Sequence, residues 1–346
     1  MSLQGAFDSY LPQVEKELQQ IVQAPDPNQT TYYAMMRYHL GWTDEALQAA
    51  RNATGKRLRP LVCLLCCQAA GGNPRQALPS ACAIELVHNF SLVHDDIEDA
   101  SPMRRGRRAV WSVWGTAHGI NVGDGLFVLA RVALHRLQGR GVRLRRYQAA
   151  TQALDQACLS LCEGQFLDMT FEDRSQVDLD EYLGMIHLKT GALLAASAQL
   201  GAILATDDQR LIDLYRSFGQ NLGMAFQIQD DVLGIWGEEG ITGKPAGTDL
   251  RDKKKTLPVV YALSLAGDRA AAGRLAGLYA QPGPLDVQAI ESALEALDHV
   301  GARQYAEQRA NEYYHLAIGS LDQTRIVNAA QSDLRELAAS LLGRKT

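Results

Sequence analysis

The sequence predicts an all-α protein, a large helix bundle, on the strength of two observations. Nearly every apolar stretch repeats in steps of three and four residues, the period of a helix that buries one face. Alternating Val, Ile and Thr runs bounded by hairpin turns are missing, so a sheet is not expected. The first helical stripe ends at a Pro-Asp-Pro-Asn breaker and consists of Phe7, Tyr10, Leu11, Val14, Leu18, Ile21 and Val22.

The same period continues along the chain. Further helices are expected at residues 58–70, 77–100, 117–138, 147–170, 180–204, 208–235, 256–266, 287–299, 302–318 and 324–342. Residues 237–255 break the pattern, because they are rich in glycine and lysine. A polar loop of this length is usually either functional or disordered, and its position behind an acidic motif favours a functional loop.

Length and composition narrow the class of protein. The 346 residues are expected to form one domain, residues 1–346, although the length also admits two. The formal charge of −5 argues against a general nucleic-acid binder. No run approaches the roughly 18 consecutive apolar residues of a membrane span, and the first residues lack a basic leader. We therefore expect a cytoplasmic protein without a membrane span.

The six cysteines are expected to be buried, reduced thiols. Cys63 and Cys66 form a CxxC pair, but they lie in an apolar run and no second pair of metal ligands follows. No zinc site is expected.

An acidic motif, Asp95-Asp96-Ile97-Glu98-Asp99, follows a largely apolar helical stretch. On a helix, Asp95 and Asp99 project from one face, a turn apart, which suits a hard cation such as Mg²⁺. Four acids in five residues repel one another and oppose the helix dipole at a helix C-terminus. A bound cation therefore explains the motif better than a solvated helix end does.

A second acidic pair, Asp230 and Asp231, ends another apolar helical stretch, and Gln227 shares its face. If the two acidic motifs face each other, they form one site for several divalent ions around a polyphosphate.

Basic segments follow both acidic motifs. Arginines at residues 104–108 follow the first motif, lysines at residues 244–255 follow the second, and a further basic segment at residues 55–60 opens an early helix. Arginine and lysine are the usual partners of phosphate oxygens. Solvated surface charge explains any one segment, but not two placed directly behind acidic pairs.

In this order, the motifs resemble those of the trans-isoprenyl diphosphate synthase family, the polyprenyl synthetases. They are GKRLRP at 55–60, ELVHNFSLVHDDIED at 85–99, RRGR at 104–107, GQFLD at 164–168, Lys189-Thr190, FQIQDD at 226–231 and GKPAGTDLRDKKKTLP at 243–258. The resemblance implies an all-α bundle with a central reaction cavity.

The resemblance also implies residue roles. Asp95, Asp99 and Asp230, with Asp231 nearby, would hold about three Mg²⁺ ions per site, with Mn²⁺ as an alternative. Isopentenyl diphosphate would be held by Lys56, Arg59, His88 and Arg105. The allylic substrate would be contacted by Arg104, Lys189, Thr190, Gln227, Lys244 and Lys254, and the dipoles of Thr190 and Gln227 would stabilise an allylic cation.

The implied reaction is the condensation of isopentenyl diphosphate with an allylic diphosphate (dimethylallyl, geranyl or farnesyl), with release of pyrophosphate. Family members are commonly homodimers. Phe90 and Ser91, just before the first acidic motif, resemble the chain-length positions of geranylgeranyl (C20) synthases, which makes a C20 product the first expectation and farnesyl (C15) the next. A helical wheel places Phe90 well away from the face of Asp95.

One position departs from the family pattern. Gly234 replaces the third acid of the second motif, which puts in question how that metal site is completed.

Two other functions stay open. A class I terpene cyclase would share the first acidic motif but would not need the residues assigned to isopentenyl diphosphate. A non-catalytic regulatory subunit of a heteromeric synthase would be expected to lose acidic or basic motifs, and here only the acid at Gly234 is missing.

Overall fold

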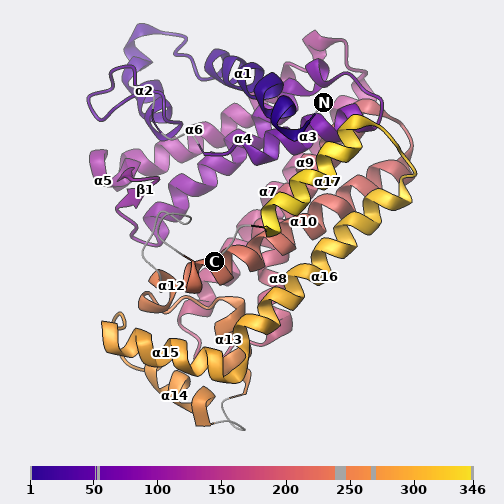
Figure 1. Ribbon diagram of the computed structural model, residues 1–346. Coiled ribbons are helices and arrows are strands. Elements are labelled where there is room, and N and C mark those ends of the chain that lie inside the picture. The colour runs from indigo at the N-terminus through magenta and orange to yellow at the C-terminus, as the bar shows by residue number, and fades with distance from the viewer. Residues whose placement is uncertain (1, 51, 53–54, 238–246, 266–269, 344–346) are drawn as a thin grey trace. The chain divides into compact units, whose positions relative to one another are not determined.

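The computed structural model describes residues 2–50, 52, 55–237, 247–265 and 270–343. The fold is all-α, as predicted, and Figure 1 shows its helices in chain order. The chain divides into two compact units, which we call unit 1 (Met1–Gln156, Ala196–Arg216 and Ile326–Leu334) and unit 2 (Ala157–Ala195, Ser217–Arg325 and Arg335–Thr346). That the chain forms one domain over residues 1–346 stays a prediction.

Unit 1 holds the N-terminal helices and a small hairpin. Its elements are α1 (Leu3–Ile21), α2 (Thr30–His39), α3 (Leu58–Ala69), α4 (Pro74–Glu98), β1 (Met103–Arg104), β2 (Arg107–Arg108), α5 (Val110–Trp114), α6 (Thr116–His135) and the first part of α7 (Leu144–Glu172). Parts of α9, α10 and α17 also belong to it. Helices α4 and α6 lie side by side (Figure 1).

Unit 2 holds the later helices. Its elements are the end of α7, α8 (Leu179–Ile186), a π-turn (His187–Gly191), the start of α9 (Ala192–Ala205), most of α10 (Gln209–Trp236), α12 (Thr248–Arg251), α13 (Leu257–Ser264), α14 (Ala270–Tyr279), α15 (Val287–Val300), α16 (Ala302–Gln323) and the end of α17 (Ala329–Leu342).

Helix α3 shows why the apolar run with the CxxC pair is a core element. Its side chains at residues 61–67 are all buried, so the helix has no solvent-facing stripe. The thiols of Cys63 and Cys66 are free, and burial raises the pKa of both. Five of the six cysteines are buried as predicted, whereas Cys162 is exposed on α7.

The periodicity of apolar residues did not predict the short elements. Helices α2, α5 and α14 were not expected, because 5 to 10 residues offer few repeats of a stripe, and α14 is mostly Ala and Gly. The hairpin of β1 and β2 has two residues per strand, too short to show alternation. The predicted helix at 180–204 is divided by the π-turn.

Among the described residues, one stretch, Leu179–Ala205, is long and apolar enough to cross a membrane by length and composition alone. However, 72% of its most apolar window is buried inside the protein, as in a core helix.

Candidate active site

The first acidic motif forms the last turn of α4 in unit 1. The helix starts at Pro74 behind the cap Asn73, whose side chain accepts a hydrogen bond from the Arg75 amide. It stays helical through its last turn, since the Asp99 amide donates to the Asp95 carbonyl over 2.9 Å. Asp95 and Asp99 are therefore one turn apart, as the spacing predicted.

Arg104 pairs with this motif. Its guanidinium lies 2.6 Å from Asp96 Oδ1 and 3.1 Å from Asp95 Oδ2. Asp96 is buried, and burial raises the pKa of its carboxyl to about 6, against the opposing effect of Arg104. Asp96, which had no predicted role, thus anchors the arginine that was expected to contact the allylic diphosphate.

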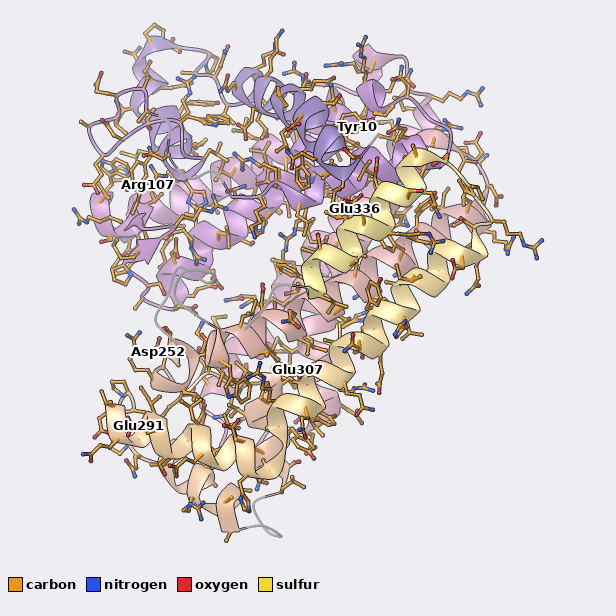
Figure 2. The ribbon with its side chains drawn as sticks, in the orientation of Figure 1. Tyr10, Arg107, Asp252, Glu291, Glu307 and Glu336 are labelled. Atoms are coloured by element: carbon orange, nitrogen blue, oxygen red, sulfur yellow. The ribbon has the colours of Figure 1, made fainter. Side chains whose placement is uncertain are left out.

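The hairpin places Arg104 and Arg105 next to this helix end. Arg105 (φ 52°) and Gly106 (φ 74°) form a two-residue turn with both residues left-handed, between the paired Arg104 and Arg107. Among the described residues, Arg105 Nη1 has no hydrogen-bond partner, and burial lowers the pKa of Arg105 to about 10. Arg107 (labelled in Figure 2) donates to the carbonyls of Tyr38, over 2.7 Å, and Thr43, and so fixes the hairpin to unit 1.

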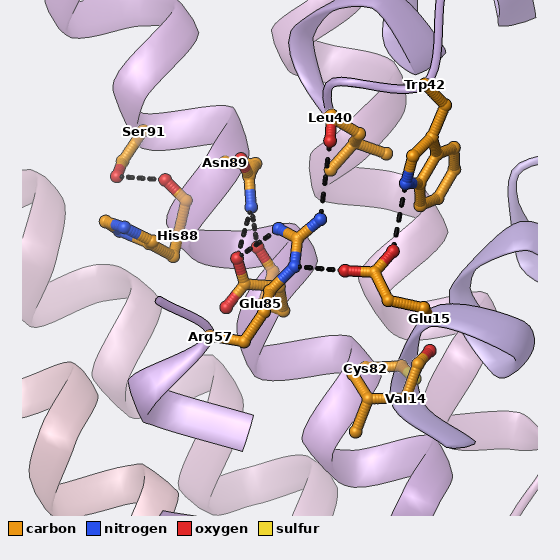
Figure 3. A network of polar contacts seen from close by, with 10 residues as sticks. All are labelled: Val14, Glu15, Leu40, Trp42, Arg57, Cys82, Glu85, His88, Asn89 and Ser91. Carbon is orange, nitrogen blue, oxygen red and sulfur yellow. Dashed lines mark hydrogen bonds and ion pairs between the residues drawn. The ribbon is translucent and has the colours of Figure 1, made fainter. Parts of the chain in front are cut away.

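The basic segment 55–60 divides into inward and outward residues. Figure 3 shows Arg57 turned inward, with Nε 2.7 Å from Glu15 and Nη1 2.6 Å from Glu85. Arg57 is therefore structural. By contrast, Lys56 is exposed and Arg59 is half-buried.

Histidines add to this basic region. His88 is half-buried on α4, and its pKa is held well below the usual range by burial and by the nearby charges of Arg59 and Arg105. Burial and, next to it, the charge of Arg105 also depress the pKa of buried His39 on α2. Unit 1 thus brings together three of the four residues predicted for isopentenyl diphosphate, with His39 as a neighbour that no motif had indicated.

The chain-length positions lie on the same helix, before the acidic motif. Phe90 is buried with its ring edge-on to Phe127 of α6, at 4.8 Å between centroids. Ser91 is half-buried and donates to the His88 carbonyl over 2.9 Å. Phe90 therefore packs toward α6, consistent with its helical-wheel position away from Asp95.

The second acidic motif, in unit 2, separates its two aspartates. Asp231 is buried and accepts hydrogen bonds from the Tyr182 hydroxyl, from the Leu257 amide over 3.0 Å and from Gln227 Nε2 over 3.0 Å. Burial nevertheless raises the pKa of its carboxyl to about 7. Asp231 thus ties α10 to α8 and α13. Its neighbour Asp230, the residue predicted to hold a metal ion, is only half-buried.

The π-turn brings Thr190 to α10 and Lys189 to α7. Thr190 Oγ1 donates to Gln227 Oε1 over 2.7 Å, and Lys189 Nζ lies 2.5 Å from Asp168 of the GQFLD motif. Helix α7 can pack this close to the π-turn only because residue 164 is glycine, since a Cβ there would lie 2.3 Å from the Lys189 amide nitrogen.

The lysines of the 237–255 segment are less informative. Lys254 is exposed, and its amide donates to the Asp249 carbonyl over 2.9 Å. Lys244 lies outside the described residues.

The donor chemistry fits hard divalent cations. Asp95, Asp99 and Asp230 offer carboxylate oxygens, the ligands that Mg²⁺ prefers, and among the described residues buried Asp96 Oδ2 has no hydrogen-bond donor. Within the part of the chain that the structure describes, no group of three or more His, Cys, Asp or Glu side chains is already gathered for a metal. Any metal ligation would therefore use phosphate oxygens or water as further ligands.

Comparisons with known proteins identify the family. The polyprenyl synthetase family model matches residues 41–297. The chain is 38% identical over 331 residues to (2E,6E)-farnesyl diphosphate synthase of Mycobacterium tuberculosis, covering 95% of this chain and 89% of that protein. It is 41% identical over 287 residues to geranylgeranyl diphosphate synthase of the same organism, covering 83% and 80%.

Structure comparison gives the same family. A crystal structure of polyprenyl synthetase from Streptomyces coelicolor superposes with a TM-score of 0.90 at 34% identity, covering 98% of this chain and 99% of that one. The fold is therefore that of the helical isoprenoid synthases. The chain belongs to the polyprenyl synthetase family. As an enzyme it is a short-chain prenyl diphosphate synthase, a prenyl-group transferase, as the sequence motifs predicted.

Proposed function

We propose that the protein condenses isopentenyl diphosphate with an allylic diphosphate, in a Mg²⁺-dependent reaction, to give geranylgeranyl diphosphate and pyrophosphate. One observation carries this proposal: the basic side chains of unit 1 fall into two sets, each of which suits a diphosphate. Arg104 pairs with Asp95 and Asp96, while the charges of Arg59 and Arg105 act on neighbouring His88. Two sets suit two diphosphate substrates, which a terpene cyclase would not need.

The metal-binding residues in this proposal are Asp95, Asp99 and Asp230. Bound Mg²⁺ would neutralise the charge that develops on departing pyrophosphate. Arg104 supplies a planar fork to the same phosphate oxygens and is pre-oriented by buried Asp96.

The basic region would fix isopentenyl diphosphate. Arg59, Arg105 and exposed Lys56 would neutralise its phosphates, and neutral His88 would donate one hydrogen bond. Breaking the allylic C–O bond leaves a cation that the isopentenyl double bond attacks, and a proton then leaves for pyrophosphate. The Thr190–Gln227 pair would turn its dipoles toward that cation, and Lys189, Lys244 and Lys254 would contact the departing diphosphate.

The deciding experiment supplies purified protein with Mg²⁺, isopentenyl diphosphate and each allylic diphosphate in turn. We expect pyrophosphate release and a C20 prenyl diphosphate, with C15 as the next outcome. If no allylic diphosphate gives a product, the synthase proposal is refuted and a regulatory subunit is favoured. A cyclic hydrocarbon from a single allylic diphosphate would favour a terpene cyclase.

The predicted length of the product depends on the two positions Phe90 and Ser91. The relatives above include both farnesyl and geranylgeranyl synthases. Only one aromatic, Phe90, is placed just before the acidic motif, and it is packed against α6, which supports the longer product.

We also propose a cytoplasmic homodimer. Three apolar side chains on one face of α6 are exposed: Ile120 (46%), Val128 (57%) and Val132 (45%). Their separations of eight and four residues place them in one stripe. A second copy of the chain is the partner that would cover it.

A further inference from the structure

Gly234 stands where the second acidic motif would carry its third acid. It lies on α10 four residues after Asp230, so a side chain here would share the Asp230 face, about 6 Å along the helix axis. Asp95 and Asp99 have the same separation in the first motif. Position 234 is therefore where a second carboxylate would complete a pair with Asp230.

A carboxylate from another element already occupies that space. A Cβ added to Gly234 would lie 1.9 Å from Asp249 Oδ2 and 2.7 Å from Asp249 Cγ, closer than real Cβ contacts. The Asp249 carboxylate thus takes the volume that a side chain at position 234 would fill. While the Asp249 side chain keeps this position, only glycine fits at position 234.

Unit 2 holds Asp249 there through both backbone and core contacts. Asp249 lies on α12, whose preceding residue Gly247 donates to the Ile235 carbonyl of α10 over 3.1 Å. Leu250 and Ile235 are fully buried in one hydrophobic cluster. Helix α12 is therefore fixed against the last turn of α10.

Asp231 offers no substitute, because the Tyr182 hydroxyl, the Leu257 amide and the Gln227 amide already bond its buried carboxylate.

We propose that Asp249 supplies the carboxylate missing at position 234 and, with Asp230, holds the divalent cation that carries the diphosphate. This inference rests on the proposed function, because it assigns a further metal-holding residue to the same reaction. The second acidic site is thus assembled from two elements, α10 and α12, and Gly234 makes room for the second of them.

The test measures Mn²⁺ binding in the presence of inorganic pyrophosphate, by the electron paramagnetic resonance signal of free Mn²⁺. We expect Asp249→Asn to weaken Mn²⁺ binding 10- to 100-fold, the usual effect of losing a residue that supports a metal site. Asp252→Asn is the matched control. Asp252 (labelled in Figure 2) is exposed, pairs with Arg251 and should leave Mn²⁺ binding unchanged. Unchanged binding in Asp249→Asn would overturn the proposal.

Moving the carboxylate from position 249 to position 234 tests whether the two positions compete for one space. Gly234→Asp alone should weaken Mn²⁺ binding, because its side chain collides with Asp249. The double variant Gly234→Asp/Asp249→Ala should recover binding to within about threefold of wild type by removing the collision while keeping one carboxylate. In that variant the Cβ atoms of positions 234 and 249 would lie 3.5 Å apart, an ordinary contact. If the double variant melts like wild type and binds no better than Gly234→Asp, the proposal fails.

Prenyl transfer is assayed separately. A wild-type enzyme that makes prenyl diphosphate while Asp249→Asn binds Mn²⁺ normally would refute this inference and keep the proposed function. A wild-type enzyme that makes no product would refute the proposed function, and the Mn²⁺ comparison would still decide the role of Asp249.

Discussion

At the scale of single residues, neighbouring acids in one motif have different surroundings. Asp96 and Asp231 are buried and hydrogen-bonded to Arg104 and to Tyr182, respectively, and each follows a more exposed aspartate. Adjacent residues on a helix point about 100° apart, so the two acids of a pair face different surroundings. One can be buried against a partner while the other stays available to a ligand. The proposed metal-binding role therefore belongs to Asp95, Asp99 and Asp230.

Replacing Asp99 with Asn should lower kcat more than about 100-fold, because even supporting residues of metal sites are worth 10- to 100-fold. Raising the Mg²⁺ concentration should restore part of the rate. Glu98→Gln, a change in the adjacent exposed acid, is the control and should keep nearly full activity. Equal rates for Asp99→Asn and wild type would remove Asp99 from the metal site.

His39 should make the protein less stable in mild acid. Its folded-state pKa is depressed by burial and by Arg105, whereas an unfolded histidine takes up a proton below about pH 6.5. Below that pH the unfolded state binds more protons, so stability falls as pH falls, by up to about 1.4 kcal/mol per pH unit.

Thermal unfolding at pH 7.5 and 5.5 checks this expectation. His39→Gln should lose less stability between the two pH values than wild type does. His315→Gln, a change in an exposed histidine on α16, should behave as wild type. An unchanged pH dependence in His39→Gln would contradict the assignment.

At the scale of elements, the π-turn and the glycine facing it place Lys189 and Thr190. A π-turn inside a helical stretch is frequent at functional sites, and here it interrupts the α8–α9 stretch where Gly164 of α7 packs against it. Periodicity predicted one continuous helix, since inserting one residue hardly alters an apolar pattern.

Gly164→Ala should therefore damage both stability and activity. The added methyl would meet the Lys189 backbone, which cannot rotate aside, and overpacking of this kind costs about 1–3 kcal/mol. We expect a lower melting temperature and at least a tenfold loss in kcat. Gly184→Ala, on α8 with nothing within 4 Å, is the control and should be neutral or slightly stabilising. Wild-type behaviour of Gly164→Ala would show that α7 can move away without consequence.

At the scale of the whole molecule, the apolar stripe on α6 makes the oligomeric state testable. Val128→Asp puts a charge into the proposed interface, so sedimentation equilibrium should report the 37.8 kDa chain instead of twice that mass. Leu144→Asp changes another exposed apolar residue, 63% exposed and outside the stripe, and should leave the dimer intact. A wild-type protein that sediments as a monomer would refute the dimer.

The sequence alone determined most of the long helices, which carboxylates share a helix face, and the family. These properties are local: helical period, a four-residue spacing and the order of motifs are all visible along the chain. Accordingly, α3, α4 and α10 begin and end within a few residues of their predicted bounds.

Only the tertiary structure decided which members of each motif lie against residues from distant parts of the chain. Arg57 pairs with Glu15 and Glu85, Asp231 with Tyr182, and Asp249 fills the space beside Gly234. Each partner lies 15 to 49 residues away in the chain, at a spacing that no local pattern encodes. Burial of a charge depends on the partner that packing brings to it, and packing is settled when distant helices meet.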